Sequence, residues 1–196
     1  MTVSIELQME QMGQRAKKAA RVLSAAAPAA KTQALRALAA LLIERQPDIL
    51  KANALDVDAA KAANMDAPRL DRLTLTPRIM ADMADACLHV ADMADEVGVI
   101  EQQWQRPNGL MIGKMRIPLG VIAMIFESRP NVTIDAAILC LKAGDAVILR
   151  GGSEAIHSNL ALAGLLHEAL RSAGLPEDAA QVVETTDRAA VAALCK

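Results

Sequence analysis

Residues 129–155 read RPNVTIDAAILCLKAGDAVILRGGSEA, and this stretch decides the fold. It predicts an apolar helix over 132–143, with Asn131 as its N-cap and Gly144 at the left-handed position that ends it. The run AVILR at 146–150 is typical of a strand that is buried on both faces. A helix followed at once by a buried strand indicates a parallel α/β sheet.

Further elements extend the sheet on both sides of this stretch. The continuous apolar run GVIAMIF at 120–126 predicts a first strand, also covered on both faces. Ser153 is expected to cap a long helix that ends near Gly174. QVVE at 181–184 predicts a third strand, and a last helix begins near Thr186. This alternation predicts right-handed crossovers between parallel strands.

Residues 1–95 form a predicted helical region that packs on the sheet. Apolar residues recur there at helical spacing, and the breaks fall where proline enters the sequence, at Pro28, Pro47 and Pro68. Thr76 before Pro77 is typical of a helix start, because threonine caps and proline suits the first turn. Cys87 lies on the apolar face of that helix, so core packing is its expected role.

Residues 96–117 predict a β-hairpin, because two extended runs flank Asn108-Gly109. A two-stranded ribbon is only marginally stable alone in water, so it needs another surface to pair with. We therefore expect a homo-oligomer that uses this hairpin as a contact. Residues 118–196 are the third predicted region and hold the parallel sheet.

Composition and charge exclude several classes of partner. The net charge is −2, from 21 basic and 23 acidic residues that are interspersed along the chain, so neither nucleic acid nor an anionic membrane is an expected partner. Aromatic residues make up 1%, which offers no platform for stacking bases. The amino terminus has no leader pattern and no apolar stretch is long enough to cross a bilayer, so a cytoplasmic protein is expected.

The cysteines and histidines do not have the spacing of a disulfide framework or a metal site. No CxxC or HExxH pattern occurs, so we expect no metal ion and reduced thiols. These residues are Cys87, Cys140, Cys195, His89, His157 and His167.

Ligands of parallel sheets bind beyond the carboxyl ends of the strands, where two loops are predicted at 127–131 and 150–153. Gly151 and Gly152 would let the backbone approach a ligand, the following helix would supply unpaired N–H groups, and Arg150 adds a positive charge. This combination suggests a phosphate or ribose-phosphate site. A simple tight turn beside a solvated arginine is the alternative.

Residues 117–155 resemble the cofactor-domain core of the aldehyde dehydrogenase superfamily. Within it, LDRLTLTP at 70–77, RPNVT at 129–133 and CLKAGDAVILRGG at 140–152 are similar to the branch that reduces an acyl phosphate. The resemblance implies NADPH-dependent reduction of L-glutamyl 5-phosphate to L-glutamate 5-semialdehyde and phosphate, in proline biosynthesis. It also implies a Rossmann-like sheet that binds its dinucleotide without a GxGxxG sequence.

The resemblance gives individual residues a role. Asn131 is similar to the superfamily asparagine whose amide stabilises the oxyanion formed at the reacting carbonyl. Arg150 stands where a basic residue reaches the adenosine phosphate or ribose of NADP(H), and Gly151 and Gly152 would line that pocket. Ser153 completes the expected cofactor site, although the general dehydrogenase loop has a proline and a serine after the basic residue.

The nucleophilic cysteine implied by the resemblance lies in a second domain, beyond residue 196. Cys140 sits among leucines, where a thiol is inert, and Cys195 does not match the nucleophile. We therefore expect this chain to be the cofactor-domain half of a reductase and to be inactive alone. A non-catalytic nucleotide-binding or assembly module is the alternative, and the role of residues 127–129 stays open.

Overall fold

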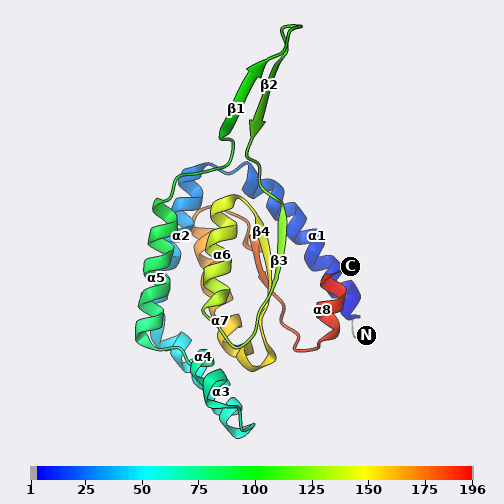
Figure 1. Ribbon diagram of the computed structural model, residues 1–196. Coiled ribbons are helices and arrows are strands. Elements are labelled where there is room, and N and C mark those ends of the chain that lie inside the picture. The colour runs from blue at the N-terminus through cyan, green and yellow to red at the C-terminus, as the bar shows by residue number, and fades with distance from the viewer. Residues whose placement is uncertain (1–3, 196) are drawn as a thin grey trace.

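The protein is described by a computed structural model covering residues 4–195, in which five helices precede a two-stranded hairpin and strands and helices alternate from β3 onward (Figure 1). The helices are α1 (Ile5–Ser24), α2 (Pro28–Glu44), α3 (Gln46–Ala62), α4 (Ala67–Leu73), α5 (Pro77–Asp92), α6 (Val132–Ala143), α7 (Ile156–Ser172) and α8 (Ala189–Leu194). The strands are β1 (Ile100–Gln105), β2 (Met111–Met115), β3 (Val121–Ile125), β4 (Ala146–Arg150) and β5 (Ala180–Val182).

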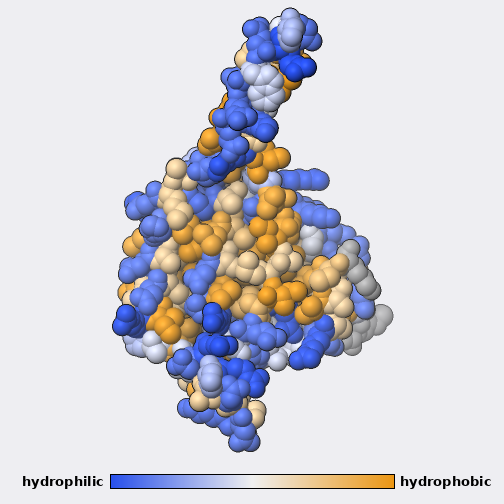
Figure 2. All heavy atoms as spheres, in the orientation of Figure 1, coloured by the Kyte–Doolittle hydropathy of each residue, from blue (hydrophilic) through white to orange (hydrophobic). Residues whose placement is uncertain are grey.

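The predicted parallel sheet is confirmed, with strand order β3-β4-β5. Every residue of β4 is buried, as expected for its position between two strands. The prediction that residues 120–126 are covered on both faces is wrong, because β3 is partly exposed and Ile125 is 46% exposed. In the described chain β3 is an edge strand, and Figure 2 shows apolar residues gathered over this part of the surface.

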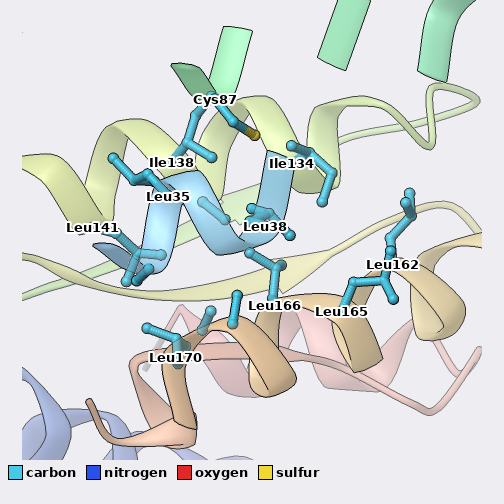
Figure 3. Close-up of a cluster of buried hydrophobic side chains, with 14 of the residues drawn as sticks. Leu35, Leu38, Cys87, Ile134, Ile138, Leu141, Leu162, Leu165, Leu166 and Leu170 are labelled. Atoms are coloured by element: carbon cyan, nitrogen blue, oxygen red, sulfur yellow. The ribbon is translucent and has the colours of Figure 1, made fainter. Parts of the chain in front are cut away.

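One hydrophobic core joins the amino-terminal helices to those of the sheet region. Helix α2 contacts α5, α6 and α7, while α1 packs on the sheet and on α8. The close-up in Figure 3 shows aliphatic side chains of α2, α6 and α7 converging, with Cys87 of α5 among them. Cys87 is 0% exposed, so its predicted core position is confirmed.

The hairpin of β1 and β2 is confirmed and projects away from the body (Figure 1). At its tip only Gly109 has a positive φ, of 86°, and its N–H donates to the carbonyl of Arg106 at 2.9 Å. Asn108 keeps a negative φ, and its side chain accepts a hydrogen bond from the Leu110 N–H at 3.2 Å. All residues of β1 are exposed, which leaves the ribbon without a packing partner in the described chain.

Two of the predicted helix termini are confirmed. The N–H of Ile79 donates to the Thr76 hydroxyl at 3.2 Å, so Thr76 caps α5. Gly144 has a φ of 82° and ends α6 in the left-handed conformation. Both are local signals, formed by residues close together in the sequence.

Asn131 stands at the N-cap position of α6 as predicted, but its side chain does not cap the helix, and the N-cap role predicted for Ser153 is wrong. Asn131 already has helical dihedral angles, and its side chain makes no capping hydrogen bond. Ser153 opens a 3-10 turn, Ser153–Ala155, and α7 begins only after it. The first N–H groups of α6 donate instead to the backbone carbonyls of Arg129 and Pro130, each at 3.0 Å, and the cap of α7 comes from another helix.

Asp56 of α3 caps α7 from outside that helix. Its carboxylate accepts hydrogen bonds from the N–H groups of His157 at 3.1 Å and Ser158 at 2.8 Å, and from the Ser158 hydroxyl at 2.6 Å. Asp56 is 3% exposed, and the positive end of the helix dipole compensates part of its buried charge. The amino-terminal helices are thereby tied to the helix that follows β4.

Asn53, one turn before Asp56, extends this network. Its side-chain amide donates to the Leu73 carbonyl at 2.8 Å and to the Ser158 hydroxyl at 3.0 Å. Its carbonyl accepts from the N–H of Leu75 at 2.8 Å. The segment between α4 and α5 is thus fixed to the same point as the start of α7.

A second buried contact anchors the chain that enters the hairpin. Lys31 of α2 is 2% exposed, and its ammonium lies 2.5 Å from the carboxylate of Asp95. Burial alone would raise the pKa of Asp95, but hydrogen bonds from Lys31 and the Val97 N–H hold it below its ordinary value. Lys31 also donates to the carbonyl of Lys142 at 3.2 Å, which connects α2, α6 and the hairpin entry.

We expect Asp56→Ala to lower the free energy of unfolding by about 2–4 kcal/mol, because it removes a helix cap and leaves buried donors unpaired. The matched control is Asp58→Ala, which removes an exposed carboxylate from the same helix and should change stability by less than about 0.5 kcal/mol. Urea denaturation of the three proteins measures both values. Equal stability of the Asp56 and Asp58 variants would contradict this role of Asp56.

Candidate functional site

The carboxyl ends of β3 and β4 lie at the end of the body opposite the hairpin (Figure 1). Two hollows open near these strand ends. The first hollow has a volume of about 480 Å³ and lies between the loops after β3 and β4 and helix α8; its walls include Phe126, Arg150, Gly152, Ser153, Thr186 and Arg188. The second hollow has a volume of about 380 Å³ and lies between α4, α5 and the start of α6; its walls include Asp71, Arg72, Asp82, Arg129, Asn131 and Asp135. The predicted site residues are thus divided between two neighbouring spaces.

Arg150 is largely buried in the wall of the first hollow, with 7% exposure. Its guanidinium donates to the carbonyl of Gly151, and to that of Thr186 at 3.1 Å. Its Nε is buried and has no hydrogen-bond partner among the described residues. Arg150 therefore braces the loop after β4 against the segment after β5 while it contributes a positive charge to the hollow.

The two glycines after Arg150 make room for neighbouring side chains. A Cβ at position 151 would collide with the Asn159 amide, which is held in place because its carbonyl accepts from the Thr133 hydroxyl at 2.9 Å. A Cβ at position 152 would collide with the carboxylate of Glu154. Packing within the protein is therefore a sufficient reason for Gly151.

The N-terminus of α7 does not offer the free N–H groups that the sequence suggested. The N–H groups of His157 and Ser158 donate to Asp56, so that part of the prediction is wrong. Glu154, beside this helix start, accepts from the N–H and the hydroxyl of Ser128, each at 2.7 Å. The positive charges near the first hollow are consequently those of arginine side chains.

The surroundings of Glu154 lower the pKa of its carboxyl. Burial alone would raise the pKa of its carboxyl, but hydrogen bonds, among them those from Ser128, and the charge of Arg150 hold the pKa below its ordinary value. Ser128 has a φ of 47°, an uncommon conformation for a residue other than glycine, and Glu154 holds it there. The loop after β3 is thus fastened to the loop after β4.

Two residues of the first hollow were missed by the sequence reasoning. Thr186 and Arg188 follow β5, and the exposed side chain of Arg188 has no ion pair or hydrogen bond within residues 4–195. The rule that ligands bind beyond the carboxyl ends of parallel strands would have pointed to them. With apolar walls from Val191 and Ala192, the first hollow has the groups that suit a nucleotide: arginines for phosphate, hydroxyls for ribose and an apolar surface for a base.

Asn131 lines the second hollow, where its side chain is oriented by a carboxylate. Its Nδ2 donates a hydrogen bond to the Asp135 carboxylate at 2.9 Å. This bond fixes the orientation of the amide, with its nitrogen toward Asp135. Burial raises the pKa of Asp135, and the hydrogen bond from Asn131 partly offsets this. One amide N–H of Asn131 remains without a partner in the described part of the chain.

The three cysteines differ in their accessibility. Burial, reinforced by the charge of Asp135, raises the pKa of Cys87 to about 12; burial, reinforced by Asp145, raises that of Cys140 to about 11. Cys195 is exposed and lies at the wall of the first hollow. The buried thiols are therefore held in the neutral, weakly nucleophilic form.

Between residues 4 and 195, no cluster of three or more histidine, cysteine or carboxylate side chains has the arrangement needed for a metal ion. Within the same range, no helix combines the length and the apolar character required to cross a membrane.

Several curated proteins and solved structures similar to this chain carry the name γ-glutamyl phosphate reductase. The chain is 69% identical over 194 residues to the γ-glutamyl phosphate reductase of Nitratidesulfovibrio vulgaris, covering 99% of this chain and 46% of that protein. It is 65% identical to the protein of the same name from Desulfovibrio desulfuricans, covering 96% of this chain and 45% of that protein. The chain thus spans about half the length of the curated relatives it matches.

The same likeness holds in three dimensions. The crystal structure of γ-glutamyl phosphate reductase from Thermotoga maritima superposes with a TM-score of 0.92 at 37% identity, over 95% of this chain and 45% of that one. The Saccharomyces cerevisiae structure of the same name superposes with a TM-score of 0.86 at 27% identity, over 91% of this chain and 47% of that one. The sequence pattern of the aldehyde dehydrogenase family matches residues 3–196. The chain therefore belongs to the aldehyde dehydrogenase family.

Proposed function

We propose that this chain is the nucleotide-binding half of an NADPH-dependent γ-glutamyl phosphate reductase. The full-length protein would reduce L-glutamyl 5-phosphate to L-glutamate 5-semialdehyde and phosphate in proline biosynthesis. The observation that carries this proposal is the Asn131 amide, which is anchored by Asp135 and keeps one N–H free where ligands of parallel sheets bind. The names of the similar proteins support it.

The cofactor of the proposed enzyme is NADP(H), held in the first hollow by Arg150, Gly152 and Ser153; Gly151, the other residue predicted for this site, packs against Asn159 and does not line the hollow. The family makes a nicotinamide nucleotide the expected cofactor, and the first hollow contains arginine, hydroxyl and apolar groups that suit one. When bound, this group supplies the hydride for the reduction. Arg150 contributes positive charge from a braced position, so it loses little side-chain freedom when it meets a phosphate.

Asn131 stabilises the negative charge that develops on the substrate. A thiolate attacks the acyl phosphate, the carbonyl oxygen becomes an oxyanion, and phosphate leaves as the thioester forms. The free N–H of Asn131 donates to that oxygen, while Asp135 keeps the amide from rotating. We propose that the thiolate comes from a part of the full-length protein outside this chain, since Cys87 and Cys140 are buried.

A cytoplasmic location is part of the proposal. Its support is the set of free thiols, which suits a compartment that keeps cysteine reduced. The competing function is a non-catalytic nucleotide-binding or assembly module, and it predicts nucleotide binding without turnover.

We expect Arg150→Ala in the full-length protein to weaken NADPH binding about 10- to 100-fold and NADH binding much less, because a guanidinium–phosphate contact is lost. Titration calorimetry with both nucleotides measures the difference. The matched comparison is Arg188→Ala, which removes the other arginine of the same hollow. Equal losses for NADPH and NADH in the Arg150 variant would contradict a contact with the 2′-phosphate.

We expect Asn131→Ala in the full-length protein to reduce turnover about 10²- to 10³-fold, because an oxyanion donor is lost. The melting temperature should change little, since the Asn131 side chain caps no helix. The assay follows NADPH oxidation with L-glutamyl 5-phosphate generated in place. Purified residues 1–196 are the negative control and should be inactive.

Either of two outcomes would contradict these roles. Unchanged turnover of the Asn131 variant would remove the oxyanion role. Turnover by residues 1–196 that Cys195→Ala abolishes would place the nucleophile in this chain. If the full-length protein binds NADPH but never oxidises it with this substrate, the binding-module function is favoured.

We also propose that the hairpin of residues 96–117 is the contact of a homo-oligomer. Both strands are exposed along nearly their whole length and carry large apolar side chains, among them Ile100, Trp104 and Met111. Replacing residues 100–115 by a short glycine–serine linker should lower the number of subunits that sediment together. If the full-length protein with the linker sediments with the same number of subunits as the unaltered protein, this contact is contradicted.

A further inference from the structure

The second hollow brings together two segments that are far apart in the sequence. Residues 70–77 contribute Asp71 and Arg72, and residues 129–133 contribute Arg129 and Asn131. Its volume of about 380 Å³ lies within the usual range for pockets that hold a small molecule, ~300–1,000 Å³. The hollow therefore extends the Asn131 site toward α4 and α5.

The two arginines of this hollow are unpaired. Arg72 and Arg129 are exposed and make neither a side-chain hydrogen bond nor an ion pair with any residue from 4 to 195. Some other surface arginines are engaged: Arg36 contacts Asp92 at 2.8 Å, and Arg171 contacts Glu177 at 2.8 Å. Two free guanidinium groups beside one hollow are available for an anion such as a carboxylate.

The hollow also carries negative charge, from three aspartates. Asp135 is engaged by Asn131, and Asp82 lies 4.0 Å from Arg78, whereas the carboxylate of Asp71 has no partner in the described range. Arginines and aspartates in one small space suit a ligand that has both signs of charge. A free amino-acid group, with one carboxylate and one ammonium, is such a ligand.

The position of Asn131 sets how such a ligand would lie. If the reacting carbonyl accepts from the Asn131 amide, the rest of the substrate extends into the space that this side chain lines. In a γ-linked glutamyl group, the α-carbon lies only a few bonds from that carbonyl. Its carboxylate and ammonium then fall among the charged side chains of the same hollow.

We propose that the second hollow recognises the amino-acid end of the acyl substrate, with Arg72 and Arg129 binding the α-carboxylate and Asp71 and Asp82 facing the α-ammonium. This inference rests on the proposed function and adds the residues that determine substrate specificity. The first hollow stays free for the nucleotide. Substrates that lack the amino-acid group lose these contacts but keep the contact with Asn131.

The test uses the full-length protein in the oxidative direction, with NADP⁺ and phosphate. L-glutamate 5-semialdehyde is compared with butanal, which has the same aldehyde chain without the ammonium and the carboxylate. The aldehyde and phosphate become the acyl phosphate while NADP⁺ takes the hydride and a proton is released, so both reactions are followed by NADPH formation. The variants are Arg72→Ala, Arg129→Ala and Arg72→Lys, with Lys51→Ala removing an exposed positive charge that does not line the hollow.

We expect each arginine-to-alanine variant to lower kcat/KM for L-glutamate 5-semialdehyde about 10- to 100-fold, mainly through KM, because a charge-assisted hydrogen bond is lost. The value for butanal should stay within roughly twofold. Arg72→Lys should restore part of the loss, and Lys51→Ala should behave as the unaltered protein. Since both arginines are exposed and unpaired, the melting temperatures should be unchanged.

If the arginine variants lose kcat/KM equally for both aldehydes, or lose it for neither, this assignment of the second hollow is overturned. Failure of the proposed function looks different: the unaltered full-length protein would then not oxidise L-glutamate 5-semialdehyde at all.

Discussion

The buried carboxylate of Asp56 is the contact on which the geometry of both hollows depends. An unpaired charge in this position would be costly, and the three donors at the start of α7 remove that cost. Asn53 joins the same network and fixes the chain before α5. Because α7 follows the loop of the first hollow and α4 and α5 form a wall of the second, one polar cluster sets the position of both.

In the proposed function, the two hollows at the carboxyl edge of the sheet bind different ligands. Around the first hollow, Arg150 and Glu154 fasten three loops together, and the space between them suits a nucleotide. In the second, Asn131 is turned by Asp135 and lies beside two free arginines. The proposed chemistry needs both spaces, since hydride and acyl group must meet between them.

Local signals in the sequence predicted what local physics determines. Thr76 and Gly144 act on residues within one helical turn, and the apolar run of β4 follows from its central position, so all three could be read directly. Ser153 failed as a cap because the true cap, Asp56, comes from a distant helix. The burial of β3 was overestimated because a strand is covered fully only when it has neighbours on both sides, and β3 has a neighbouring strand on one side only in the described chain. Tertiary packing brings Arg72 and Arg129 to the same hollow, so no sequence pattern predicted that they lie near each other.

A crystal structure of the full-length protein with NADP⁺ and L-glutamate tests this division most directly. We expect the adenosine phosphate beside Arg150 and Arg188 in the first hollow, and the α-carboxylate of glutamate between Arg72 and Arg129 in the second. Nucleotide density in the second hollow, or an amino acid bound away from both arginines, would contradict the account.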